Sequence, residues 1–130
     1  MRKRWFLFPC SVVLLITFFM LACGSGSSNQ LQSVSVSPAT ATGLAQFTAT
    51  GTYTNGSKVT PLTALWSQNS PWSQVIAQDF SLDANGKASC LTVAGTFTVQ
   101  ATAPVDPHEP LSQMVPTTPQ VFGTAQLTCP

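Results

Sequence analysis

Residues 31–56 read LQSVSVSPATATGLAQFTATGTYTNG and alternate apolar with small polar side chains. In the first run, Val34 and Val36 alternate with serine, and the run stops at Pro38 as an edge strand does. The stretch ends in Asn55-Gly56, the dipeptide most typical of a tight hairpin turn. A period of two puts successive side chains on opposite faces of a strand, so these residues predict short antiparallel strands.

The rest of the chain continues this pattern. A second Asn-Gly turn stands at Asn85-Gly86, and helical spacing of apolar residues is almost absent after residue 30. About seven short strands separated by turn signals predict an all-β sandwich over residues 31–130. Beyond the opening stretch the expected strands lie within SKVTPLTALWS (57–67), SQVIAQDFSLD (73–83), KASCLTV (87–93), GTFTVQATA (95–103) and VFGTAQLTC (121–129).

The ordered succession of these segments resembles a known family. VSVSPATATGLAQFTATGTYTNGSKVTPLTALWSQNS looks like the front half of a bacterial immunoglobulin-like domain of group 2, the intimin and invasin type. LDANGKASC followed by AGTFTVQATA resembles the family's back half, so the likeness covers residues 31–103 and a last strand at 121–129. The resemblance implies an immunoglobulin-like β-sandwich in which Trp66 is the buried core tryptophan. It implies no catalytic residue.

Two segments depart from the family pattern. SPWSQVIAQDFSL is longer and more apolar than the corresponding segment of the family, and APVDPHEPLSQMVPTTPQ is a proline-rich insertion before the last strand. Prolines at 104, 107, 110, 116 and 119 exclude a central strand and favour extended or turn structure. We therefore expect a proline-rich loop at 104–119, the place where a specific surface could be displayed.

Charge is scarce and unevenly placed. Charged residues make up 7% of the 130, and three of the five basic ones are Arg2, Lys3 and Arg4. From Cys23 onward the chain has two lysines and four carboxylates, so its net side-chain charge there is −2. No basic patch is left there, which argues against a nucleic-acid partner.

The N-terminus has the pattern of an export signal. The basic tripeptide precedes an apolar stretch whose strongest part is Val12–Leu21, shorter than the roughly 20 residues that a membrane span needs. Residues 1–22 are therefore expected to be a signal peptide. Counting from Trp5 gives eighteen mostly apolar residues, so an uncleaved membrane anchor is the competing interpretation.

Met20-Leu21-Ala22-Cys23 resembles the bacterial lipobox, in which a small residue precedes the cysteine that becomes the lipid-bearing N-terminus. The resemblance implies a covalent lipid on Cys23, with residues 23–30 as a flexible tether and the membrane as a partner through the anchor. The location implied is the bacterial cell envelope, at the outer membrane if the source has one. An ordinary signal-peptide end near Cys23 is the alternative. Cys10, which follows Pro9, is expected to leave with the signal peptide.

Two further cysteines, Cys90 and Cys129, lie on expected strands. In an exported domain such a pair favours a disulfide, because two thiolates without a nearby His cannot complete a zinc site. A closed loop of about 40 residues would stabilise the fold by roughly 3–4 kcal/mol. Two unpaired buried thiols are the alternative.

Side chains that could carry chemistry are few. The chain has one His and one Glu, His108-Glu109, among prolines on the expected loop, where solvated loop residues explain them. Asp83-Ala84-Asn85-Gly86 contains a fragment of a calcium-binding loop, but the other ligand positions of such a loop are not matched. A hairpin turn explains these residues. Trp72, after Pro71, is freer than Trp66 to serve a surface. We expect no metal site, no cofactor and no enzymatic activity.

These observations predict a lipid-anchored envelope protein whose sandwich serves adhesion, display or structural interaction. The alternative is a module that binds a peptide or carbohydrate through the proline-rich loop and Trp72, with His108 and Glu109 on the same surface. An envelope protein or a glycan would then be the partner. Sandwiches of this kind have many unrelated functions, so the fold alone does not distinguish between these two.

Overall fold

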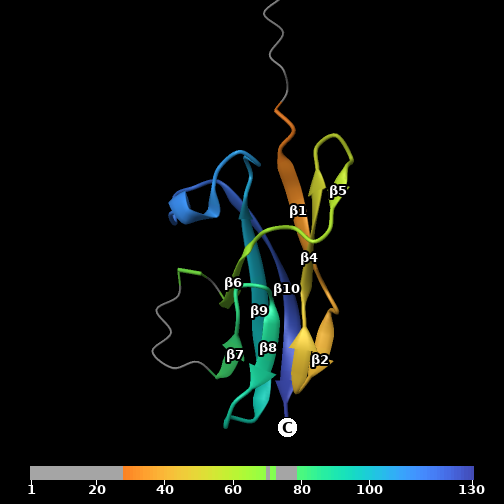
Figure 1. The fold of residues 1–130 in the computed structure, drawn as a ribbon, viewed down its shortest axis with the longest axis vertical. Helices are drawn as coiled ribbons and strands as arrows, with labels where there is room; N and C mark the ends of the chain where they lie inside the picture. The colour runs from red at the N-terminus through yellow and green to blue at the C-terminus, as the bar shows by residue number, and fades with distance from the viewer. Residues whose placement is uncertain (1–27, 70, 73–78) are drawn as a thin grey trace, which may run out of the picture.

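The computed structural model describes residues 28–69, 71, 72 and 79–130, and these residues form an almost entirely β fold (Figure 1). The all-β sandwich predicted from the sequence is confirmed. The elements are β1 (Leu31–Ser37), β2 (Thr40–Thr42), β3 (Leu44–Gln46), β4 (Thr48–Tyr53), β5 (Lys58–Val59), β6 (Leu65–Gln68), β7 (Phe80–Leu82), β8 (Lys87–Cys90), β9 (Gly95–Pro104), a 3₁₀ helix at Leu111–Gln113, and β10 (Gln120–Cys129).

The described strands outnumber the seven expected because some expected strands are divided. LAQFTATGTY is split at Phe47 into β3 and β4, and the residues around Pro61, which has no N–H to donate, separate β5 from β6. The segment before β3 adds β2, which the sequence pattern did not predict. KASCLTV pairs only as far as Cys90, and the exposed Leu91 and Val93 lie beyond the strand.

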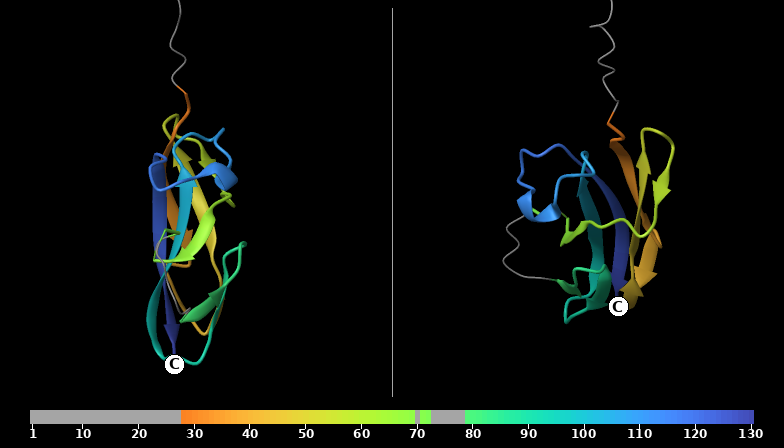
Figure 2. Two further views of the ribbon diagram at one scale, coloured as in Figure 1. Left: turned by 90° about the vertical axis from the view of Figure 1, so that its left-hand side faces the viewer. Right: turned by 45° about the horizontal axis from the view of Figure 1, so that its top comes forward.

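The strands form three hydrogen-bonded sheets, each of which we call a ladder. One has the order β1-β4-β5, a second β3-β8-β7, and a third, four-stranded, β2-β10-β9-β6. Because β3 and β4 are consecutive pieces of one chain, the first two ladders are joined through Phe47. The fold in Figures 1 and 2 is long and narrow, with β9 and β10 running along most of its length.

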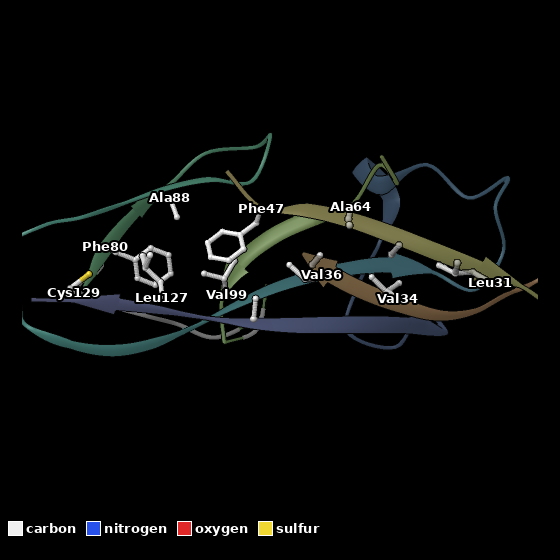
Figure 3. Close-up of a cluster of buried hydrophobic side chains, with 14 residues drawn as sticks. Leu31, Val34, Val36, Phe47, Ala64, Phe80, Ala88, Val99, Leu127 and Cys129 are labelled. Atoms are coloured by element: carbon white, nitrogen blue, oxygen red, sulfur yellow. The ribbon is translucent and has the colours of Figure 1, made fainter. Parts of the chain in front are cut away.

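The core lies between the ladders and draws on all three. Figure 3 shows its side chains in one strip along the long axis, with Phe47, Phe80, Val99 and Leu127 fully buried near the middle and one end. The rings of Phe80 and Phe97 lie 5.9 Å apart at that end. Trp66 packs against this cluster but remains partly exposed, so it lies at the edge of the core and is not buried within it as expected.

The chain passes from one ladder to another between β1 and β2. β1 pairs antiparallel with β4, whereas β2, just after Pro38, pairs parallel with β10. Gly43 then has φ +74°, which lets the chain turn again into β3. The opening stretch of the domain therefore contributes to all three ladders.

Both Asn-Gly sequences form the turns predicted for them. Gly56 and Gly86 each have φ +82°, a conformation that glycine adopts without steric penalty. In the second turn, Asp83 Oδ1 accepts backbone N–H groups from Asn85 at 2.8 Å and Lys87 at 2.9 Å. The Asp83 carboxylate thus holds a hairpin together, which is the role that the sequence favoured over a calcium loop.

β9 and β10 form a continuous antiparallel hairpin from the Gln120–Pro104 pair to the Cys129–Gly95 pair. The proline-rich loop closes one end of this hairpin. Residues 99–104 of β9 are all buried, so both faces of this part of the strand are covered. The length of the hairpin separates the two ends of the sandwich by about 30 Å, at roughly 3.3 Å per residue.

Candidate functional site

The chain enters the sandwich through a short hydrogen-bonded strap, Asn29 and Gln30. The Gln30 backbone N–H donates to Thr54 Oγ1 at 3.1 Å, and the Thr54 N–H donates to the Gln30 carbonyl at 2.9 Å. Asn29 Oδ1 accepts from the Asn55 N–H at 3.3 Å and from the Thr54 hydroxyl at 3.4 Å. The strap therefore fastens the two residues before β1 to the β4–β5 turn.

This strap shortens the segment that the sequence assigned to a tether, since Asn29 and Gln30 are attached to the domain. Their polar side chains and the Gly/Ser residues before them gave no sign of it, because the partner is a turn 25 residues further along the chain. Cys23, the residue predicted to carry lipid, lies outside the described residues, as does the expected signal peptide.

The proline-rich loop expected at 104–119 comprises residues 105–119, because Pro104 is the last residue of β9 and pairs with Gln120. It begins and ends next to this strap. The Leu31 N–H donates to the Val105 carbonyl at 2.8 Å, and the Val105 N–H donates to the Pro119 carbonyl at 2.9 Å. Figures 1 and 2 show the loop and the β4–β5 turn at the same end of the sandwich, opposite to the C-terminus. We call this the proximal end.

The loop is folded on itself, with turns and a 3₁₀ helix (Leu111–Gln113) where extended or turn structure was expected. Met114 and Thr118 are buried. Thr118 Oγ1 accepts from the Val115 N–H at 3.1 Å and donates to Glu109 Oε1 at 3.5 Å. Glu109 is half-buried, and the Thr118 hydroxyl links its carboxylate to the loop backbone.

His108 is on the outside of the loop. Its side chain is 89% exposed and lies 3.3 Å, Nδ1 to Oδ1, from Asp106, and its backbone N–H donates to the same carboxylate oxygen at 2.9 Å. That backbone hydrogen bond is the main reason why the pKa of Asp106 is below its ordinary value, and the His108 ring adds to the effect. The arrangement is a small polar turn in which the imidazole contacts the Asp106 carboxylate.

A cavity of about 320 Å³ lies beside the loop at the proximal end. The described residues that line it are mostly aliphatic or proline, with Tyr53 as the aromatic one and Glu109 as the charged one. Trp72 and His108 are not among the residues that line it. The lining residues are Leu31, Tyr53, Val59, Pro61, Leu62, Thr63, Ala103, Pro104, Pro107, Glu109, Pro110 and Leu111.

Sequence reasoning missed the side of this cavity that lies away from the loop. Tyr53 and Leu62 come from β4 and from the segment between β5 and β6, and only the folding of the chain brings them next to Pro107 and Leu111. A second cavity, of about 390 Å³, shares Pro61, Leu62 and Thr63 with the first and extends toward Trp66.

Trp72 lies half-buried, and its indole N–H donates to Gln120 Oε1 at 3.4 Å. Gln120 is the first residue of β10, so the contact links the segment after β6 to the start of the last strand. The three residues expected on one binding surface have different surroundings. Glu109 lines the cavity, His108 lies outside it, and Trp72 contacts β10.

The other end of the sandwich is closed by the predicted disulfide, which is confirmed. Cys90 and Cys129 are bonded, with Cα atoms 5.5 Å apart, and Cys129 is buried. The bond encloses the proline-rich loop in sequence, but in space the bond and the loop lie at opposite ends of β10. Near the bond are three exposed aliphatic side chains, Leu44, Leu91 and Val93. We call this the distal end.

Within the part of the chain that the structure describes, no three His, Cys, Asp or Glu side chains gather closely enough to hold a metal ion. In those same residues, no helix has the length and apolar character needed to cross a membrane. Comparison of the chain with protein-family models finds no matching family, and no curated protein matches it significantly.

Proposed function

We propose that this protein is a non-enzymatic bacterial envelope protein, anchored by lipid on Cys23, whose immunoglobulin-like sandwich serves adhesion, display or structural interaction. The observation that carries the proposal is the sequence Met20-Leu21-Ala22-Cys23 and its position, six residues before the strap at Asn29. An apolar run that ends in this motif and is followed, after a short polar segment, by a β-sandwich is the arrangement expected of a lipid-anchored domain.

The anchor is strong enough for the task. Burial of each methylene of an acyl chain contributes about 0.8 kcal/mol, so two or three chains hold a protein durably where one does not. In proteins with a lipobox, an Asp directly after the cysteine retains the protein in the inner membrane. Gly24 therefore agrees with an outer-membrane destination in a bacterium that has one.

Mass spectrometry of the mature N-terminus tests the proposal, with Cys23→Ala compared with Cys10→Ala. We expect a diacylglyceryl-modified cysteine at residue 23 in the wild type and in Cys10→Ala, with both proteins in the membrane fraction. Cys23→Ala should lose the modification and the cleavage. An intact Met1 in the wild type, or an unmodified terminus after Ala22, would contradict lipid attachment.

A second candidate function, peptide binding, is favoured by the cavity beside the loop. Its aliphatic and proline walls, the ring of Tyr53 and the carboxylate of Glu109 suit a short segment with an apolar side chain and one basic group. Titration with a panel of short proline-containing and basic peptides tests it. Glu109→Gln should weaken binding at least tenfold and His108→Ala should leave it unchanged; equal affinities in both variants would exclude this site.

A further inference from the structure

The position of the strap determines which end of the domain is nearest to the membrane. Cys23 and Asn29 are six residues apart, and a polypeptide spans at most about 3.6 Å per residue. Whatever conformation the intervening residues adopt, Asn29 therefore lies within about 22 Å of a lipid-bearing Cys23.

Asn29 is itself part of the proximal end. Four hydrogen bonds join the strap to Thr54 and Asn55, and Leu31 is bonded to Val105 at the base of the proline-rich loop. The β4–β5 turn and the loop are consequently within a few residues of the attachment point. By contrast, the Cys90–Cys129 bond lies at the far end of β10 (Figure 1).

We propose that the strap orients the anchored domain, so that the proximal end (residues 29–31, 54–57 and 105–119) faces the lipid surface and the distal end faces away from it. This inference rests on the proposed attachment at Cys23. It assigns the proline-rich loop to the membrane side and leaves the distal end, with Leu44, Leu91 and Val93, accessible to macromolecules.

The charges of the proximal end do not by themselves favour this assignment, whereas those of the distal end are compatible with it. Near the proximal end Asp106 and Glu109 outnumber Lys58, so an anionic lipid surface does not attract this end, and the chain rather than charge keeps it close. The segments around the distal aliphatic side chains, residues 40–45 and 89–98, contain no charged residue. A large partner approaching from solution therefore meets an uncharged, partly apolar surface.

Fluorescence quenching by a nitroxide-headgroup lipid measures the orientation. The full-length lipidated protein is reconstituted in phosphatidylcholine vesicles with a fluorophore on Thr117→Cys, in the loop, or on Thr42→Cys, next to Thr128 at the distal end. Mass analysis checks that the native disulfide is intact. We expect quenching at Thr117→Cys to be at least threefold stronger; equal quenching, or stronger quenching at Thr42→Cys, would overturn the orientation.

Two further variants test the strap. Insertion of twenty Gly/Ser residues after Gly26 leaves the sandwich unchanged and should reduce the contrast between the two positions to less than 1.5-fold. Asn29→Ala with Thr54→Val should reduce it in part, whereas Ser33→Ala, an exposed change on β1, should not. A contrast that survives the insertion would show that adsorption, not the strap, orients the domain.

The N-terminal mass of the same samples separates this inference from the proposed function. A lipid on Cys23 without contrast between the two positions overturns the orientation and leaves the attachment standing. An unmodified terminus together with loss of protein from the vesicles overturns both.

Discussion

The backbone of Val34 crosses directly over Gly123. A Cβ placed on Gly123 would lie 2.5 Å from the Val34 carbonyl oxygen and 2.8 Å from its carbonyl carbon. These atoms are backbone, so they cannot rotate away as the end of a side chain could. This contact is where β1, which pairs with β4, passes over the inner face of β10 and brings two ladders together.

Gly123→Ala should therefore destabilise the fold by about 3 kcal/mol, since overpacked sites of this kind typically lose 1–3 kcal/mol. Urea unfolding followed by tryptophan fluorescence measures the change. Thr124→Ala, at the next and exposed position of β10, is the matched control and should stay within about 0.5 kcal/mol of the wild type. Equal stabilities for the two variants would show that β1 does not approach β10 this closely.

Removal of the disulfide by Cys90→Ala with Cys129→Ala should lower the free energy of unfolding by about 3–4 kcal/mol, the chain-entropy value for a separation of 39 residues. Thermal unfolding of the double variant, compared with that of the reduced wild type, gives the measurement. Thiol titration of the denatured wild type should find neither Cys90 nor Cys129 reactive. Two titratable thiols at these positions would contradict the bond.

Asp83→Ala should destabilise the β7–β8 turn by about 1–2 kcal/mol, because two backbone N–H groups lose their acceptor. Asp83→Asn, which keeps an acceptor oxygen, should recover most of this loss. Calcium at millimolar concentration should leave the unfolding midpoint of the wild type unchanged. A calcium-dependent increase that Asp83→Ala abolishes would mean that the turn also binds the ion.

The Asp106 carboxyl should titrate below its ordinary pKa of 3.8 in the folded protein, chiefly because the His108 N–H donates to it. Its ionised form then favours the folded loop above about pH 4, and that contribution is lost as the pH falls through the lowered pKa. NMR titration should find the pKa still lowered in His108→Ala, which keeps the N–H, and restored in His108→Pro, which lacks it. The same pKa in both variants would contradict a backbone cause.

Gly86→Ala tests how the second Asn-Gly turn meets the core. A Cβ there would lie 2.6 Å from the Phe47 carbonyl oxygen and 2.8 Å from the Trp66 ring, and the residue has φ +82°. We expect a loss of more than 2 kcal/mol. Gly56→Ala has the same φ and open space around it, so it should lose about 1 kcal/mol; unfolding midpoints of the two variants give the comparison.

Much of the local structure could be predicted from the sequence. Period-two alternation in Val34 and Val36 and the two Asn-Gly turns depend on a few neighbouring residues, and the structure has strands and turns there. The Cys90–Cys129 pair could be predicted because few alternatives exist once Cys10 and Cys23 are assigned elsewhere. Each of these inferences needs only local chemistry or simple elimination.

The sequence by itself thus determined the all-β class, the positions of both Asn-Gly turns and the identity of the cysteine pair. Only the tertiary structure decided that Asn29 bonds to the turn at Asn55, that Gly123 lies under Val34, and that Trp72 bonds to Gln120. These relationships join residues far from each other in the chain, and nothing in a local pattern specifies how ladders pack. They follow from burying one core among three ladders, which is a property of the whole folded chain.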